Sequence, residues 1–202
     1  LTKKLVHEWL GNEKVDYGKK EKKDQVGTVT GLAYTSFGGD ILQIEATRFT
    51  GKGRLVLTGQ LGDVMKESAS IALDYVRTHA TEFKIDPKLF EENDVHIHVP
   101  EGAVPKDGPS AGVTMTTALV SCFSNIPVKA NLAMTGEVTL RGNVLPIGGL
   151  KEKSLAAHRS GIDTILIPKE NVKDLDDVPQ EVKDAVTFIP CSNVSQVLHN
   201  AL

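Results

Sequence analysis

Residues 109–124 form a largely apolar segment that begins directly after Gly108. Proline suits the first position of a helix, because its missing N–H needs no partner there and its φ is already helical. We therefore predict a helix from Pro109 to about Ser124, with Gly108 as N-cap and Ser110 as the second helical residue. Its early residues are small and apolar, which favours close packing in a core. The rest of the chain is expected to fold around this helix.

The first half of the chain predicts strands joined by glycine turns. Its short runs are rich in β-branched residues or alternate between apolar and polar side chains, as half-buried strands do. Together these runs predict a β-meander. The predicted strands are 26–34, 41–49 and 54–58, and the predicted turns are 38–40 and 51–53.

A long amphipathic helix is predicted from Gly62 to Phe83, because apolar side chains recur there at helical spacing. Met65 and Tyr75 lie on its apolar face and are interpreted as core residues. A short helix over 87–93 and a strand over 95–99 are expected to follow.

The second half of the chain alternates between strands and helices. The predicted strands are 132–138, 144–147, 164–167 and 186–189, and the predicted helices are 150–160, two short ones within 171–184, and a C-terminal helix capped by Ser192 or Asn193. The expected fold class is therefore α+β, a mixed α/β arrangement in which an N-terminal β-meander precedes alternating strands and helices.

Length and charge limit the classes of protein to consider. A chain of 202 residues suggests one domain, or one domain with a small appendage. The formal net charge of −3 implies no general attraction to nucleic acid. No apolar run approaches the length of a membrane span. Cys122 and Cys191 form no metal-binding spacing, and so few cysteines favour a reducing, cytoplasmic setting.

Residues 1–25 are polar and rich in lysine, and we interpret them as a connecting segment. The chain begins with Leu1 and not with methionine, so we expect it to be a piece of a longer protein in which this segment leads from an upstream module. Residues 26–202 are then the domain itself. Gly51-Lys52-Gly53 lacks the flanking residues of a P-loop, so we expect no ATP hydrolysis by this chain.

The turn Asp107-Gly108-Pro109-Ser110-Ala111-Gly112 is open to three interpretations. Serine near the start of a helix often acts only as a cap or a small packing residue. A glycine-rich turn before a helix can also hold a phosphate. Finally, the free N–H groups and positive dipole of a first helical turn can stabilise an oxyanion beside a nucleophilic Ser110. The last interpretation requires a base.

Histidine and lysine are the candidate bases. His96, His98 and His158 are available, but nothing in the sequence ties them to Ser110. The His96/His98 pair has no third ligand at a convincing metal spacing, so packing or hydrogen bonding is preferred. A lysine base must be neutral, which requires burial or nearby positive charge. Lys151 and Lys153 lie on different faces of the helix predicted over 150–160, and periodicity does not choose between them.

Four segments of the chain resemble the Lon family of ATP-dependent serine proteases. They occur in the family's order and spacing, and the similarity runs from about Val26 to Leu202. The segments are 95–102 (VHIHVPEG), 105–112 (PKDGPSAG), 134–142 (MTGEVTLRG) and 144–153 (VLPIGGLKEK). The resemblance implies the Lon proteolytic-domain fold and a serine endopeptidase with a Ser–Lys dyad.

The resemblance also implies roles for individual residues. Ser110 matches the nucleophile, and Lys153, not Lys151, matches the general base. Thr135 matches a residue that positions the lysine, and Asp107 matches the loop position that shapes the site. Backbone N–H groups of Ser110 and Ala111 are the expected oxyanion donors. This chemistry needs no metal.

Family members carry an upstream AAA+ ATPase module, so ATP and Mg2+ are expected there and no cofactor in this domain. The resemblance further implies a homohexameric ring, unfolded, damaged or regulatory proteins as substrates, and the bacterial cytoplasm. No nucleic-acid site is evident. Two alternatives remain at this point: a catalytically inert Lon-like binding or scaffolding module, and phosphate binding at the turn of residues 107–112.

Overall fold

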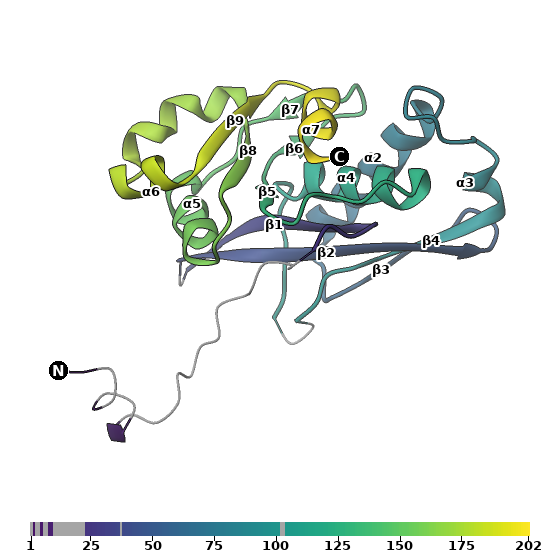
Figure 1. Cartoon of the computed structure of the whole chain (residues 1–202). Coiled ribbons are helices and arrows are strands. Elements are labelled where there is room, and N and C mark those ends of the chain that lie inside the picture. Colours follow the sequence, from purple (N-terminus) through teal and green to yellow (C-terminus); the bar gives the residue numbers. More distant parts are fainter. Residues whose placement is uncertain (1, 3–4, 6–7, 10–22, 37, 102–103) are drawn as a thin grey trace.

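The computed structural model is shown in Figure 1. It describes residues 2, 5, 8–9, 23–36, 38–101 and 104–202. The predicted connecting segment, residues 1–25, lies largely outside these described residues.

A seven-stranded sheet forms the centre of the domain, in the order β3-β4-β2-β1-β5-β8-β9. The pairs β3–β4, β1–β5, β5–β8 and β8–β9 are parallel, whereas β1–β2 and β2–β4 are antiparallel. A separate hairpin pairs β6 with β7. The strands are β1 Thr28–Thr35, β2 Gly38–Thr50, β3 Leu55–Thr58, β4 Asn93–His98, β5 Leu132–Met134, β6 Glu137–Val138, β7 Val144–Leu145, β8 Thr164–Pro168 and β9 Thr187–Cys191.

Helices cover both faces of this sheet. Figure 1 shows α2 and α4 on one side of β1 and β2, and α5 and α6 beside β8 and β9. The helices are α2 Asp63–Thr78, α3 Leu89–Glu92, α4 Gly112–Ser124, α5 Leu150–Arg159, the 3-10 helix η1 Lys169–Asp177, α6 Gln180–Ala185 and α7 Val194–Ala201. The mixed α/β class expected from the sequence is confirmed.

Two apolar clusters lie on opposite faces of the sheet. Neighbouring residues of a strand point to opposite faces, and along β8 Leu166 belongs to the cluster of α2, α4 and α7, whereas Ile165 and Ile167 belong to the cluster of α5 and α6. Met65 and Tyr75 are buried in the first cluster, which confirms them as core residues. Along the described residues, no helix is both long and apolar enough to cross a lipid bilayer.

The predicted meander is correct only for its first two strands. β1 and β2 form an antiparallel hairpin, but β3 pairs with β4 and not with β2. The reason is that α2 connects β3 to β4, and a helical crossover makes the two strands it joins parallel. The turn predicted over 38–40 is also wrong, since Gly38, Gly39 and Asp40 already pair with β1 as the start of β2.

The long helix of the first half ends earlier than predicted. α2 stops at Thr78, and residues 79–84 form turns in place of the expected continuation to Phe83. Lys84 takes a positive φ of 57°, and the N–H of Ile85 returns to the carbonyl of Ala80. This reversal turns the chain back towards the core, where Ile85 is buried.

The C-terminal half follows the predicted alternation closely. α5 occupies the predicted range, and the C-terminal helix α7 is capped by Asn193, whose side chain accepts the N–H of Gln196 at 3.0 Å. The first of the two short helices predicted within 171–184 is a 3-10 helix that begins earlier, at Lys169.

Thr114 on α4 is expected to be a site of stabilisation. Its Oγ1 is fully buried and has no hydrogen-bond partner among the described residues. Thr114→Val removes this unsatisfied hydroxyl and should raise the free energy of unfolding by about 1 kcal/mol, measured by equilibrium urea unfolding.

Thr117→Val is the matched control for this substitution. The Thr117 hydroxyl donates to the Val113 carbonyl at 2.8 Å, so its removal should bring no gain. A loss of stability in Thr114→Val would show that the hydroxyl has a partner after all.

Candidate active site

Ser110 lies in a turn before α4 and is not part of that helix. α4 begins at Gly112, and Ala111 is its N-cap, so the predicted helix start at Pro109 is wrong. The physical cause is a bond outside the helix: the Ser110 carbonyl accepts the N–H of Gly136 at 2.8 Å. Gly108 has a φ of 111°, a conformation that glycine adopts readily.

Thr135 and Gly136 hold the Ser110 turn in place. The Val113 N–H donates to the Gly136 carbonyl at 3.0 Å, and the Gly136 N–H donates to Ser110. These bonds divide the strand predicted over 132–138, because β5 ends at Met134 and β6 begins at Glu137. The backbone between the two strands therefore forms hydrogen bonds to the Ser110 turn in place of strand pairing.

Lys153 is the buried lysine of α5. Its side chain is only 2% exposed, and its Nζ donates to Thr135 Oγ1 at 3.1 Å. The Thr135 hydroxyl in turn donates to the Ser110 carbonyl at 3.4 Å. Burial lowers the pKa of Lys153 from 10.5 to about 8. Lys151 is exposed. The packing of α5 therefore shows that Lys153 lies on the buried face of the helix, which periodicity alone could not decide.

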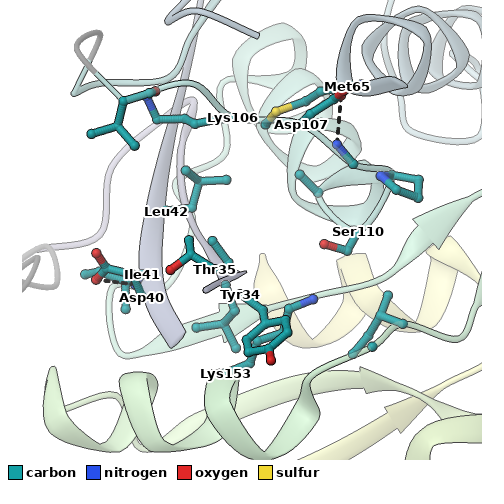
Figure 2. A pocket seen from close by; sticks show the side chains of 18 of the residues that line it. Tyr34, Thr35, Asp40, Ile41, Leu42, Met65, Lys106, Asp107, Ser110 and Lys153 are labelled. Carbon is teal, nitrogen blue, oxygen red and sulfur yellow. Dashed lines mark hydrogen bonds between the residues drawn. The ribbon is translucent and has the colours of Figure 1, made fainter. Parts of the chain in front are cut away.

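Ser110 and Lys153 line one cavity of about 420 Å³. Figure 2 shows both side chains at this cavity, Lys153 from α5 and Ser110 from the turn before α4. No hydrogen bond joins Ser110 Oγ to Lys153 Nζ within the described part of the chain. The apolar lining includes Leu42, Met65 and Ile147.

Asp107 connects the Ser110 turn to α2. Its Oδ1 accepts the N–H of Met65 at 2.9 Å and that of Gly108 at 2.8 Å. These backbone hydrogen bonds lower the pKa of the Asp107 carboxyl. The N-cap of α2, Gly62, has no side chain to offer, so Asp107 satisfies this helix start from a distant loop.

The backbone around Ser110 leaves donors available. Among the described residues, no acceptor receives the N–H of Ser110 or that of Ala111, although the neighbouring Gly112 N–H is bonded to Pro109. Two adjacent free N–H groups beside a serine hydroxyl are the arrangement that an oxyanion requires.

The histidines lie elsewhere. His96 Nε2 and His98 Nδ1 both contact the Thr58 hydroxyl, at 2.8 and 2.6 Å, which is the hydrogen-bonded role preferred from the sequence. Neither of them lines the cavity of Ser110, and His158 does not line it either.

A family comparison matches the whole chain. The matched family is described as Lon protease (S16) C-terminal proteolytic domain, and the match covers residues 1–202. The chain belongs to this Lon family. It is a Lon-type proteolytic domain, and the match starts at residue 1, before the Val26 start inferred from the motifs.

Several bacterial relatives support the same assignment. The chain is 59% identical over 202 residues to the "Lon protease" of Brevibacillus choshinensis and to that of Bacillus thuringiensis (strain Al Hakam), and 56% identical to "Lon protease 1" of Bacillus subtilis (strain 168). Each match covers 100% of this chain but only 25% or 26% of the relative. The chain thus spans about a quarter of the length of these Lon proteases.

Two supporting residues of this Lon domain were missed by sequence reasoning. Lys106 donates from Nζ to three carbonyls, those of Gly59, Glu101 and Val104, at 3.2, 2.7 and 2.9 Å. Asn171 is 2% exposed and bonds both backbone groups of Ile147. Lys106 stands within a quoted motif, but Asn171 lies in an acidic segment that gives no local signal of its contacts.

Proposed function

We propose that Ser110 and Lys153 form the catalytic dyad of a serine endopeptidase. The observation that carries the proposal is the environment of Lys153. It is a buried amine that makes no ion pair within the described residues, and it shares a cavity with a serine that lies beside free backbone N–H groups. A desolvated lysine of this kind is neutral often enough near neutral pH to act as a base.

In the proposed reaction, the neutral Lys153 amine removes the proton from Ser110 Oγ as this oxygen attacks a peptide carbonyl. The resulting ammonium then protonates the leaving nitrogen, and the amine product departs from the acyl-enzyme. Water, deprotonated by Lys153, attacks the ester, and Ser110 recovers its proton. Lys153 approaches Ser110 when substrate excludes water, since such catalytic bonds are often long or absent in free enzymes.

Thr135 is proposed to orient the amine. Its single hydroxyl proton is directed to the Ser110 carbonyl, so its oxygen accepts an N–H of Lys153. One N–H of the amine is thereby fixed, which restricts the directions open to the nitrogen lone pair. The N–H groups of Ser110 and Ala111 are proposed to stabilise the oxyanion.

The wider role of the protein is proposed from its resemblance to the Lon family. We infer that unfolded or damaged proteins are the substrates, in the cytoplasm, and that a homohexamer with upstream ATPase modules delivers them at the expense of ATP with Mg2+. Support for a reducing compartment comes from the buried, free Cys122 and Cys191. ATP is expected to serve delivery and not the chemistry at Ser110.

The pH dependence of peptide cleavage tests the lysine base. With a pKa of about 8, Lys153 is neutral in about 9% of molecules at pH 7 and about 91% at pH 9. We expect kcat/KM for a fluorogenic unfolded polypeptide, measured without ATP, to rise about tenfold between these two values.

Lys151→Ala is the control for the pH experiment, because Lys151 is exposed and its removal should leave the midpoint of the pH profile unchanged. A profile that is flat above pH 7, with its midpoint near that of a histidine, would contradict the lysine base.

A further inference from the structure

Gly148 is a glycine that the fold itself does not require. A Cβ added at this position would meet no atom within 4 Å, and Gly148 is not among the residues with positive φ. The next residue is the opposite case: Gly149 has a φ of 71°, and an added Cβ would lie 2.8 Å from the Tyr34 ring. The fold therefore explains why residue 149 has no side chain, but it does not explain why residue 148 has none.

Gly148 lies where two hollows of the surface meet. It lines the cavity of Ser110 and Lys153, and together with Ile147 it also lines a second hollow of about 400 Å³ formed with Lys151, Glu152 and Asp174. A polypeptide that extends from Ser110 into the second hollow has to cross this junction. Gly148 is exposed there, and the absence of a side chain lets another backbone approach closely.

The backbone at the junction also offers hydrogen bonds. Within the described residues, the N–H and the carbonyl of Gly148 and the carbonyl of Pro146 have no partner. They continue the line of β7 after its last paired residue, Leu145. Free main-chain groups in such a line can pair with an extended peptide as a neighbouring strand would.

Asn171 keeps this stretch of backbone in position. Its Oδ1 accepts the Ile147 N–H at 2.9 Å, and its Nδ2 donates to the Ile147 carbonyl at 2.8 Å. Nδ2 also donates to Asp174 Oδ2 at 2.6 Å, which fixes the orientation of the amide. Because Asn171 occupies both backbone groups of Ile147, the groups left for a ligand are those of Pro146 and Gly148.

We propose that the backbone of Pro146 and Gly148 is a recognition edge for the main chain of an extended polypeptide substrate, and that Gly148 lacks a side chain so that this substrate can cross it. The proposal rests on the peptidase function proposed above, and it names the part of the surface that holds the chain on one side of the scissile bond. Asn171 and Asp174 act as positioning residues for this edge.

Binding can be measured apart from cleavage in the Ser110→Ala background. The probe is fluorescein-labelled casein, an unfolded protein, and its dissociation constant is read from fluorescence anisotropy. Adding Gly148→Ala should weaken binding about tenfold, and Gly148→Val should weaken it further, because each larger side chain keeps the substrate backbone farther away. The melting temperature should stay within about 2 °C of the parent, since the added atoms meet nothing in the fold.

Four further variants separate recognition from folding. Gly149→Ala should lower the melting temperature, because it strains φ and meets Tyr34. Asp174→Asn keeps an oxygen that can accept from Asn171 and should retain affinity, whereas Asp174→Ala should weaken it. The exposed Asp176→Ala is the control and should bind as the parent does.

Unchanged affinity in both Gly148 variants would overturn the proposal, and so would a failure of the Ser110→Ala chain itself to bind casein saturably. The proposed function fails by a different result, namely cleavage that survives Ser110→Ala.

Discussion

Replacing Ser110 with alanine is expected to reduce peptide cleavage by about a thousandfold or more, to the level of the uncatalysed background. Alanine offers no oxygen for the acyl-enzyme, so Lys153 and the oxyanion donors remain without a nucleophile. The fold should tolerate the change, because the Ser110 hydroxyl makes no hydrogen bond among the described residues and the anchoring bond uses the backbone carbonyl. We expect a melting temperature within about 2 °C of the parent.

The measurement is cleavage of a fluorogenic unfolded polypeptide at high protein concentration without ATP, beside a thermal melt of each variant. Ser70→Ala is the matched control, since Ser70 is an exposed serine on α2 whose hydroxyl donates to the Lys66 carbonyl. Retained cleavage in Ser110→Ala would rule out Ser110 as the nucleophile. A large loss of stability would show instead that the hydroxyl has a structural role.

Replacing Lys153 with methionine is expected to abolish cleavage and at the same time to stabilise the domain. Methionine keeps most of the buried stem but removes the amine, so Ser110 has no base. At pH 7 the folded chain must hold an ammonium in a site that lowers its pKa from 10.5 to about 8. Removing this desolvated charge should raise the free energy of unfolding by about 1–3 kcal/mol.

The stabilisation should itself depend on pH, with a predictable sign. The pKa of Lys153 is lower in the folded than in the unfolded state, so between about pH 8 and 10.5 the unfolded chain binds more protons. The stability of the parent therefore rises with pH across this window, relative to a chain without the amine. The advantage of Lys153→Met should be complete below pH 8 and should disappear towards pH 10.5.

Urea unfolding at pH 7 and pH 10 measures this difference, with Lys151→Met as control. Lys151 is exposed on another face of α5, so its replacement should leave stability unchanged and should not abolish cleavage. If Lys151→Met were the inactive variant, the assignment of Lys153 would be wrong. If Lys153→Met lost stability, the hydrogen bond of the amine to Thr135 would stabilise the fold by more than the burial of its charge destabilises it.

The contrast between these two lysines shows what the sequence alone can predict about the site. The helix carrying both was predicted from its periodicity and is present as α5. Which face of α5 is buried depends on how the helix packs against β1 and β2. These strands lie about a hundred residues earlier in the sequence. Family motifs indicated Lys153 before the packing was known, but local periodicity could not.

Two local predictions failed for the same physical reason. The Pro109 start of α4 and the continuous strand over 132–138 both followed local preferences correctly. Each is interrupted because the Ser110 carbonyl and the Gly136 N–H bond each other across the site. The position of β4 between β2 and β3 is equally non-local, since it follows from a crossover helix. Tertiary hydrogen bonds overrode propensity at the site itself, whereas the ordinary helices of the second half kept their predicted bounds closely.

The placement of β5 has a consequence for the order of events during folding. β5 lies between β1 and β8, and Thr30 of β1 pairs with Ala133 about a hundred residues later, a contact that is slow to form because a long loop must close first. Thr135 and Gly136 follow β5 directly, and they hold Ser110 and Lys153. A partly folded chain that has not inserted β5 has therefore not yet placed Ser110 and Lys153 at one cavity. The sheet order thus delays the assembly of this cavity until the domain is nearly complete.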